Sequence, residues 1–198
     1  MKKLIRIFLW ILLVPILFFA LFLLYATVND YRPDAREPVA VFGPSTSYAS
    51  IDSVIDLMSW NIGYAGLGSE MDFFYDGGTQ VRPEKRMSQK YEAGIMQFLA
   101  ALDSLDFILL QEVDVDSRRS YHSDQLEQVR QIFNEKYAGF AMNYNVSYVP
   151  VPYYAPLGKV TSGIATLSSV RPITSERHAF TGNYSWPVRL FMLDRCYM

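Results

Sequence analysis

An uninterrupted apolar run near the N-terminus restricts this chain more than any other feature. Residues Phe8 to Leu24 include no charged or strongly polar side chain. A helix rises about 1.5 Å per residue and needs about 20 apolar residues to cross a bilayer. The run therefore predicts a transmembrane helix over residues 7 to 28, and Pro15 inside it is tolerated in bilayer helices.

The residues that flank this run indicate its orientation. Lys2, Lys3 and Arg6 precede it, whereas charges of both signs follow it. By the positive-inside rule, residues 1 to 6 are expected in the cytoplasm and the rest of the chain on the extracytoplasmic side, periplasmic or extracellular. A cleaved signal peptide is the alternative. Its apolar stretch is usually about 7 to 15 residues and ends in small residues, whereas this run ends in Leu-Leu-Tyr-Ala-Thr.

The remaining residues divide into a linker and one domain. Residues 29 to 50 are rich in proline and small polar residues and lack a sustained period, which is typical of a linker. Residues 51 to 198 begin with a short apolar stretch, Val54 to Trp60, which predicts a buried strand followed by a turn. A long loop follows from Gly63 to Met87.

A helix and a second strand come next along the chain. Apolar residues recur at spacings of three and four from Tyr91 to Leu105, which predicts a helix over Ser88 to Ser104. Asp106 to Val113 is a nearly continuous apolar run typical of a buried strand. Strand, helix, strand is the opening of a layered α/β or α+β domain. Ser123 is positioned to cap a second helix.

The last third of the domain changes to strand patterns. We expect four strands there, separated by turns rich in proline, glycine and tyrosine: Tyr137 to Met142, Val160 to Leu167, Ile173 to Phe180 and Val188 to Tyr197.

Polar side chains follow two of the predicted strands at the points where they end. Asn61 follows the first, and Gln111 and Glu112 follow the second. A carboxylate at the rim of a sheet is a ligand for a hard cation, and Mg²⁺ commonly takes only one or two protein carboxylates. An amide on the neighbouring strand is suited to donate to a phosphate oxygen.

These strand ends carry a family resemblance. The segments Leu57 to Gly63 (LMSWNIG), Ile108 to Val113 (ILLQEV) and Ser162 to Ser168 (SGIATLS) resemble three ordered motifs of the endonuclease/exonuclease/phosphatase family, which includes DNase I-like nucleases and neutral sphingomyelinases. The resemblance implies a four-layered two-sheet sandwich, a Mg²⁺ or Mn²⁺ cofactor, Glu112 as the metal ligand, and Asn61 as the active-site asparagine beside the substrate phosphate.

The resemblance covers residues 52 to 195 and only the first part of such a site. The D-x-N and Asp-His motifs of the family have no match in this sequence, and neither His122 nor His178 stands in such a motif. We therefore expect an incomplete domain that is inactive as the 198-residue chain, with the water-activating groups supplied by a longer gene product. The alternatives are a membrane-tethered, non-catalytic binding module on the same scaffold and a purely structural membrane protein.

Two further groups of residues have competing interpretations. Arg119, in the charged loop after Glu112, is either a phosphate contact or part of a solvated loop. The tyrosines around the VPVP segment either form an aromatic rim that faces lipid or substrate, or pack under the prolines. This group is Tyr144, Tyr148, Tyr153 and Tyr154.

Charge narrows the substrate class of the expected hydrolase. Beyond the apolar run, the chain holds about 15 basic against 20 acidic residues. Nucleic-acid binding is not favoured, because affinity for nucleic acids comes largely from basic residues that neutralise phosphates. A membrane anchor and an acidic domain favour a phospholipid headgroup or a small phosphodiester as the substrate. The lone Cys196 excludes an intrachain disulfide.

Overall fold

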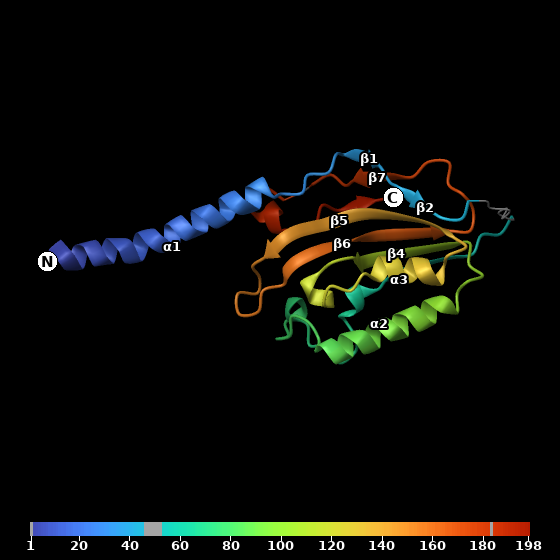
Figure 1. Cartoon of the computed structure of the whole chain (residues 1–198), viewed down its shortest axis with the longest axis horizontal. Coiled ribbons are helices and arrows are strands. Elements are labelled where there is room, and N and C mark those ends of the chain that lie inside the picture. Colours follow the sequence, from blue (N-terminus) through green and yellow to red (C-terminus); the bar gives the residue numbers. More distant parts are fainter. Residues whose placement is uncertain (1, 46–52, 183) are drawn as a thin grey trace.

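A computed structural model describes residues 2–45, 53–182 and 184–198. Its first element is a long helix, α1 (Lys2–Val28), that projects from one end of a two-sheet domain (Figure 1). Among the described residues it is the one helix long and apolar enough to cross a membrane. Its 27 residues span about 40 Å at 1.5 Å per residue, more than the roughly 30 Å of a hydrocarbon core. The predicted helix is confirmed, and its orientation in a membrane stays a prediction.

Two sheets form the body of the domain. The larger has the strand order β2-β5-β6-β4-β3, in which β3 and β4 are parallel and the other pairs antiparallel. The smaller has the order β1-β7-β8 and is antiparallel. The strands are β1 (Arg36–Pro38), β2 (Val41–Phe42), β3 (Leu57–Asn61), β4 (Phe107–Asp114), β5 (Tyr137–Val149), β6 (Gly158–Ser168), β7 (Glu176–Ala179) and β8 (Cys196–Tyr197).

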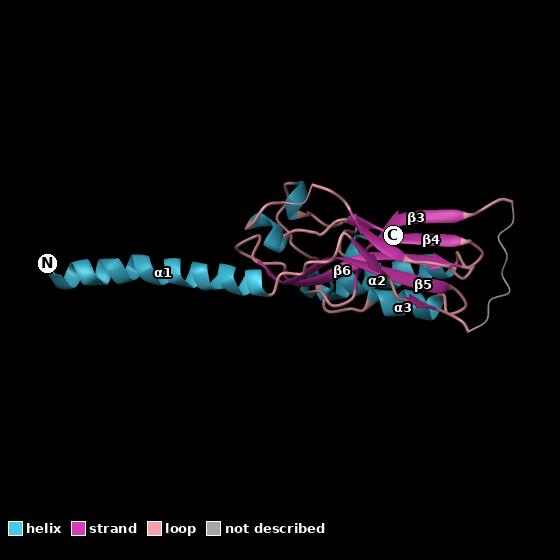
Figure 2. Ribbon diagram, turned by 90° about the horizontal axis from the view of Figure 1, so that it is seen from above, coloured by secondary structure: helices cyan, strands magenta, loops and turns pink. Residues whose placement is uncertain are grey.

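Helices cover one face of the larger sheet. In Figure 2, α2 (Lys85–Ala100) and α3 (Gln125–Ile132) lie beneath the strands. Leu99 of α2 and Val129 of α3 are fully buried against Ile108 and Leu110 of β4. Four 3₁₀ turns among the described residues complete the fold: η1 (Gly63–Ala65), η2 (Phe74–Asp76), η3 (Arg118–Ser120) and η4 (Val188–Phe191).

The smaller sheet lies on the opposite face of the larger one (Figure 1). Arg177 of β7, 1% exposed, joins the two sheets. Its Nε donates to the carbonyl of Met142 at 2.9 Å, and its Nη2 donates to the carbonyl of Asp194 at 2.8 Å. The mixed α+β class with two sheets and an N-terminal apolar helix is therefore confirmed.

The segment expected to be a linker contributes to both sheets. Within residues 29–45, β1 pairs with β7 and β2 pairs with β5. The proline and small polar residues of this segment gave no strand signal. Both strands are very short edge strands, where proline is tolerated. Residues 46–50 of the expected linker lie outside the described residues.

Several predicted elements differ in detail from the structure. Asp124, not Ser123, caps α3, because its side chain accepts from the backbone N–H of Glu127. The strand predicted over Val188–Tyr197 is wrong for most of its length, since η4 occupies its start and only β8 remains extended. The buried strand predicted over Val54–Trp60 is instead the edge strand β3, whose side chains are exposed or half-buried.

Candidate functional site

The ends of β3 and β4 bring together Asn61 and Glu112, the two active-site candidates at the strand ends. Asn61 lies opposite Gln111 in the parallel register. The side-chain amide of Asn61 donates to Oε1 of Glu112 at 2.9 Å, and its Oδ1 accepts from the backbone N–H of Gly63 at 2.9 Å. Both ends of the amide are therefore held, and its orientation is set by these two bonds.

A β-bulge turns Glu112 toward Asn61. The register between β4 and β6 shifts between Leu110 and Val113, and Glu112 has a φ of 55°. A left-handed conformation costs a side-chain-bearing residue about 1–2 kcal/mol. Such bulges re-aim a side chain at the edge of a sheet. The bulge leaves the carboxylate of Glu112 partly exposed beside the end of β3.

The turn after β3 has a strained backbone, and a buried side chain of α3 fixes it in place. Gly63, Tyr64 and Ala65 have φ values of 54°, 43° and 54°. Gln125 of α3, 1% exposed, donates through Nε2 to the carbonyl of Tyr64 at 2.8 Å. Its Oε1 accepts from the backbone N–H of Asp114 at 3.0 Å. This one buried amide thus ties the strained turn to β4.

Arg119 lies in the interior, not on a solvated loop. Its Nη2 and Nε donate to the two carboxylate oxygens of Asp114 at 2.8 and 3.1 Å, and both side chains are buried. Its guanidinium lies 3.8 Å from the ring centroid of Tyr64. Burial opposes the charge, yet Asp114 raises the pKa of Arg119 above its usual value, so the cation is retained. A phosphate contact by Arg119 stays a prediction.

The hydroxyl of Tyr64 is buried without a hydrogen-bond partner among the described residues. Burial raises the pKa of this hydroxyl, so it stays protonated. Tyr144 is the natural comparison, because its buried hydroxyl donates to the carbonyl of Phe191 at 2.9 Å. Burial likewise raises the pKa of Tyr144, to about 12.

We expect Tyr64→Phe and Tyr144→Phe to change stability in opposite directions. An unpaired buried hydroxyl is destabilising, so Tyr64→Phe should raise the free energy of unfolding by about 1 kcal/mol. Tyr144→Phe leaves the Phe191 carbonyl without its donor and should lower it by about the same amount. Urea unfolding followed by tryptophan fluorescence measures both changes, and a destabilised Tyr64→Phe would contradict the assignment of an unpaired hydroxyl.

A hollow of about 470 Å³ opens beside Asn61. The turn after β3 forms one wall, and α2 forms the other with Lys90, Tyr91, Gly94 and Ile95. Gly94 is exposed within the helix, and a Cβ added there would meet no atom within 4 Å. The residues that line the hollow are mainly apolar, and Asn61, Lys90 and Tyr91 are the polar ones among them.

The described residues contain no group of three or more His, Cys, Asp or Glu that could hold a metal ion. Glu112 is the carboxylate at the strand ends, whereas Asp114 is paired with Arg119. His122 contacts Asp116 at 2.6 Å, and His178 contacts Glu176 at 3.3 Å while stacking on Tyr197. Among the described residues, no hydrogen bond or ion pair joins either histidine to Asn61 or Glu112.

Sequence reasoning missed three residues that support the site: Tyr64, Asp114 and Gln125. The pairing of Asp114 could have been predicted from the sequence. An acidic residue at the end of a buried strand needs a partner, and two arginines follow within the next five positions. The burial of Gln125 has no such sequence signal, since a glutamine in the first turn of a helix is usually exposed.

Comparison with known proteins adds no relative at this point. No protein-family model, curated protein or solved structure matches the chain.

Proposed function

We propose that this chain supplies the metal-binding part of a membrane-anchored phosphoester hydrolase, with its domain on the extracytoplasmic side. The hydrogen bond between Asn61 and Glu112, at the ends of adjacent parallel strands, is the observation that carries the proposal. In this proposal Glu112 holds Mg²⁺ or Mn²⁺, and Asn61 fixes the substrate phosphate. The second N–H of the Asn61 amide is left for a phosphate oxygen, since the first is donated to Glu112.

The donor set suits a magnesium-type ion rather than a softer metal. Glu112 offers oxygen ligands, and Mg²⁺ is often bound through one or two carboxylates with water and phosphate oxygens filling the other positions. Oε1 of Glu112 accepts from Asn61, so Oε2 is the oxygen best placed to coordinate. When bound, the ion would neutralise phosphate charge and polarise the phosphoryl group. The residues that activate water are not assigned among the described residues.

The first test measures metal binding by the chain itself. Full-length chain in detergent micelles should bind Mn²⁺, as detected by electron paramagnetic resonance, and Mg²⁺ should compete. If the proposal is right, the longer gene product expected from the sequence should hydrolyse a phosphodiester such as bis-p-nitrophenyl phosphate and lose that activity with a chelator. Metal binding without any hydrolysis would support the non-catalytic binding module, and the absence of metal binding would remove Glu112 from a metal site.

Gly94→Leu tests whether the hollow beside Asn61 receives the alcohol part of the substrate. Glycine inside a helix is less favourable than leucine by roughly 0.5–1 kcal/mol, so the variant should fold and gain stability. The new side chain would extend from the wall of the hollow, because Gly94 lines it and no atom beyond the neighbouring helix backbone lies within 4 Å of the added Cβ. We expect a higher KM for phosphodiesters with bulky alcohol groups and unchanged Mn²⁺ binding.

Ala93→Leu is the matched control for this change. Ala93 is exposed one position earlier on the same helix and does not line the hollow. An equal rise in KM for both variants would show that the hollow does not hold the substrate.

A further inference from the structure

The C-terminal end of α1 packs against one end of the domain. The ring of Phe22 stacks on Phe191 at 5.7 Å and meets Tyr148 edge-on at 6.1 Å. The indole N–H of Trp186 donates to Thr27 at 3.2 Å. Phe22 lies six residues before the end of α1, which corresponds to about 9 Å along the helix. If α1 spans a bilayer, this end of the domain rests at its surface.

The loop between β5 and β6, residues 150–157, lies at the same end (Figure 1). Tyr153 at its tip is 90% exposed, and Tyr154 is 56% exposed. The loop has a defined conformation, because the backbone N–H of Leu157 donates to the carbonyl of Val151 at 3.1 Å and Nη1 of Arg118 donates to the carbonyl of Pro156 at 3.1 Å. Exposed tyrosines are enriched at the level of lipid headgroups.

Arginines gather beside this aromatic loop. Arg82, Arg118 and Arg119 line a hollow of about 330 Å³ together with Tyr154 and Leu157. Asp114 neutralises Arg119, but no salt bridge to Arg82 or Arg118 exists among the described residues. The neighbouring carboxylate of Asp116 is paired with Lys159 and His122.

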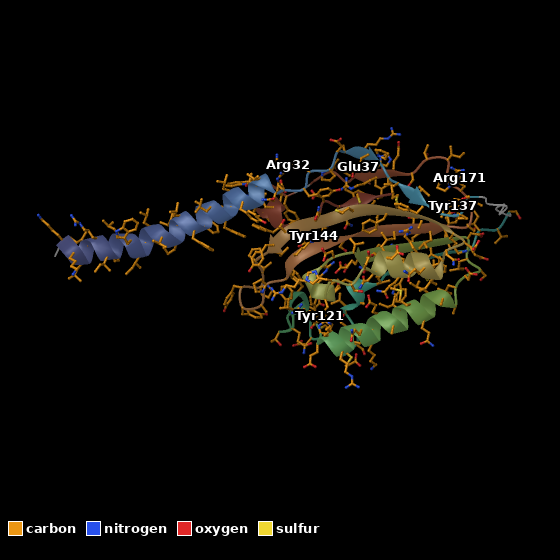
Figure 3. The ribbon with its side chains drawn as sticks, viewed as in Figure 1. Arg32, Glu37, Tyr121, Tyr137, Tyr144 and Arg171 are labelled. Atoms are coloured by element: carbon orange, nitrogen blue, oxygen red, sulfur yellow. The ribbon has the colours of Figure 1, made fainter. Side chains whose placement is uncertain are left out.

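The two unpaired guanidinium groups are held in place. Nη1 of Arg82 donates to the carbonyl of Arg118 at 2.6 Å, and its guanidinium lies 4.4 Å from the ring centroid of Tyr121. Figure 3 shows Tyr121 and Tyr144 on the side of the domain toward α1, and Arg171 at the far side. Two adjacent cations without a counter-ion repel each other, and an arginine fork matches the geometry of a phosphate. The arrangement therefore favours the binding of an anion between the two arginines.

We propose that Arg82 and Arg118 bind the phosphate of a phospholipid, with Tyr153 and Tyr154 in the interfacial layer beside it. A lipid is favoured over free phosphate because the arginine hollow shares its wall with the exposed aromatic loop, and both lie at the end where α1 leaves the domain. This second contact holds the domain against the bilayer, with the ends of β3 and β4 at the same end of the sheet. It does not depend on the proposed hydrolase activity.

The experiment measures how deeply position 153 enters the lipid layer of vesicles. A polarity-sensitive dye is attached at Tyr153→Cys in full-length chain with Cys196→Ser, and quenching is measured with spin-labelled lipids. Vesicles of phosphatidylcholine are compared with vesicles of an uncharged, phosphate-free glycolipid, so that both surfaces carry no net charge. We expect strong quenching in phosphatidylcholine and clearly weaker quenching in glycolipid. Ile173→Cys, fully exposed, is the solvent control, and Leu13→Cys in α1 is the membrane control.

Charge removal then tests the two arginines. Arg82→Gln with Arg118→Gln should abolish the difference between the two lipids at Tyr153, whereas Arg171→Gln, an exposed arginine far from α1, should preserve it. Inorganic phosphate at millimolar concentration should leave the quenching unchanged. Any of three results would overturn the lipid assignment. The dye at position 153 could be quenched no more than the dye at position 173, quenching could be equal in both lipids, or inorganic phosphate could displace the loop.

Discussion

In the proposed longer hydrolase, Glu112→Gln is expected to lower kcat/KM by roughly a hundredfold or more, because it removes the charge proposed to hold the metal. The substitution keeps the shape of the side chain and its hydrogen bond from Asn61, since an amide oxygen also accepts. The loss should therefore reflect metal binding and not misfolding. Mn²⁺ affinity, measured on the same variant, should fall together with activity, and excess Mn²⁺ should restore part of it.

Glu135→Gln is the matched control for this prediction. Glu135 is exposed in the turn before β5, far along the chain from the strand ends, and the same chemical change there should leave kcat/KM and Mn²⁺ affinity unaltered. Turnover by Glu112→Gln close to that of the unmodified protein would remove Glu112 from the site. A loss of activity without any change in Mn²⁺ affinity would assign it a role other than metal binding.

Local patterns predicted the elements that place Asn61 and Glu112. The apolar stretch before Asn61, the helical period around Leu99 and the apolar run before Glu112 correspond to β3, α2 and β4, with boundaries shifted by a few residues. These patterns work because a helix face and a buried strand each repeat their apolar positions over a short distance. Parallel pairing of β3 and β4 then follows from the helical connection between them.

Features that depend on distant partners were not predictable in this way. The pairing of β1 with β7 joins residues about 140 positions apart, and no local pattern in the proline-containing segment around Arg36 indicates it. The bulge at Glu112 is set by register with β6, more than 40 residues later. The burial of Arg119 required Asp114, Tyr64 and Ser162 to meet, and the charges alone suggested a solvated loop.

Asp114→Asn is expected to destabilise the domain strongly. It keeps the shape of the side chain but leaves the Arg119 guanidinium buried without a counter-charge. Removing one partner of a buried ion pair typically costs about 3–5 kcal/mol, a large share of the roughly 5–15 kcal/mol by which a domain is stable. Urea unfolding in detergent, followed by tryptophan fluorescence, measures the loss. Mn²⁺ affinity at Glu112 should also fall, because Arg119 supports the Tyr64 turn that follows Asn61.

Two comparisons separate this interior ion pair from ordinary surface charge. Asp116→Asn removes a carboxylate that pairs with Lys159 and His122 at the surface, and exposed pairs contribute at most about 1 kcal/mol. Asp114→Leu combined with Arg119→Met removes both buried charges together, and replacing a whole buried pair with apolar groups is often nearly neutral. The double variant should therefore be more stable than Asp114→Asn alone. A loss in Asp114→Asn no larger than that in Asp116→Asn would show that Arg119 does not depend on Asp114 for its charge in the interior.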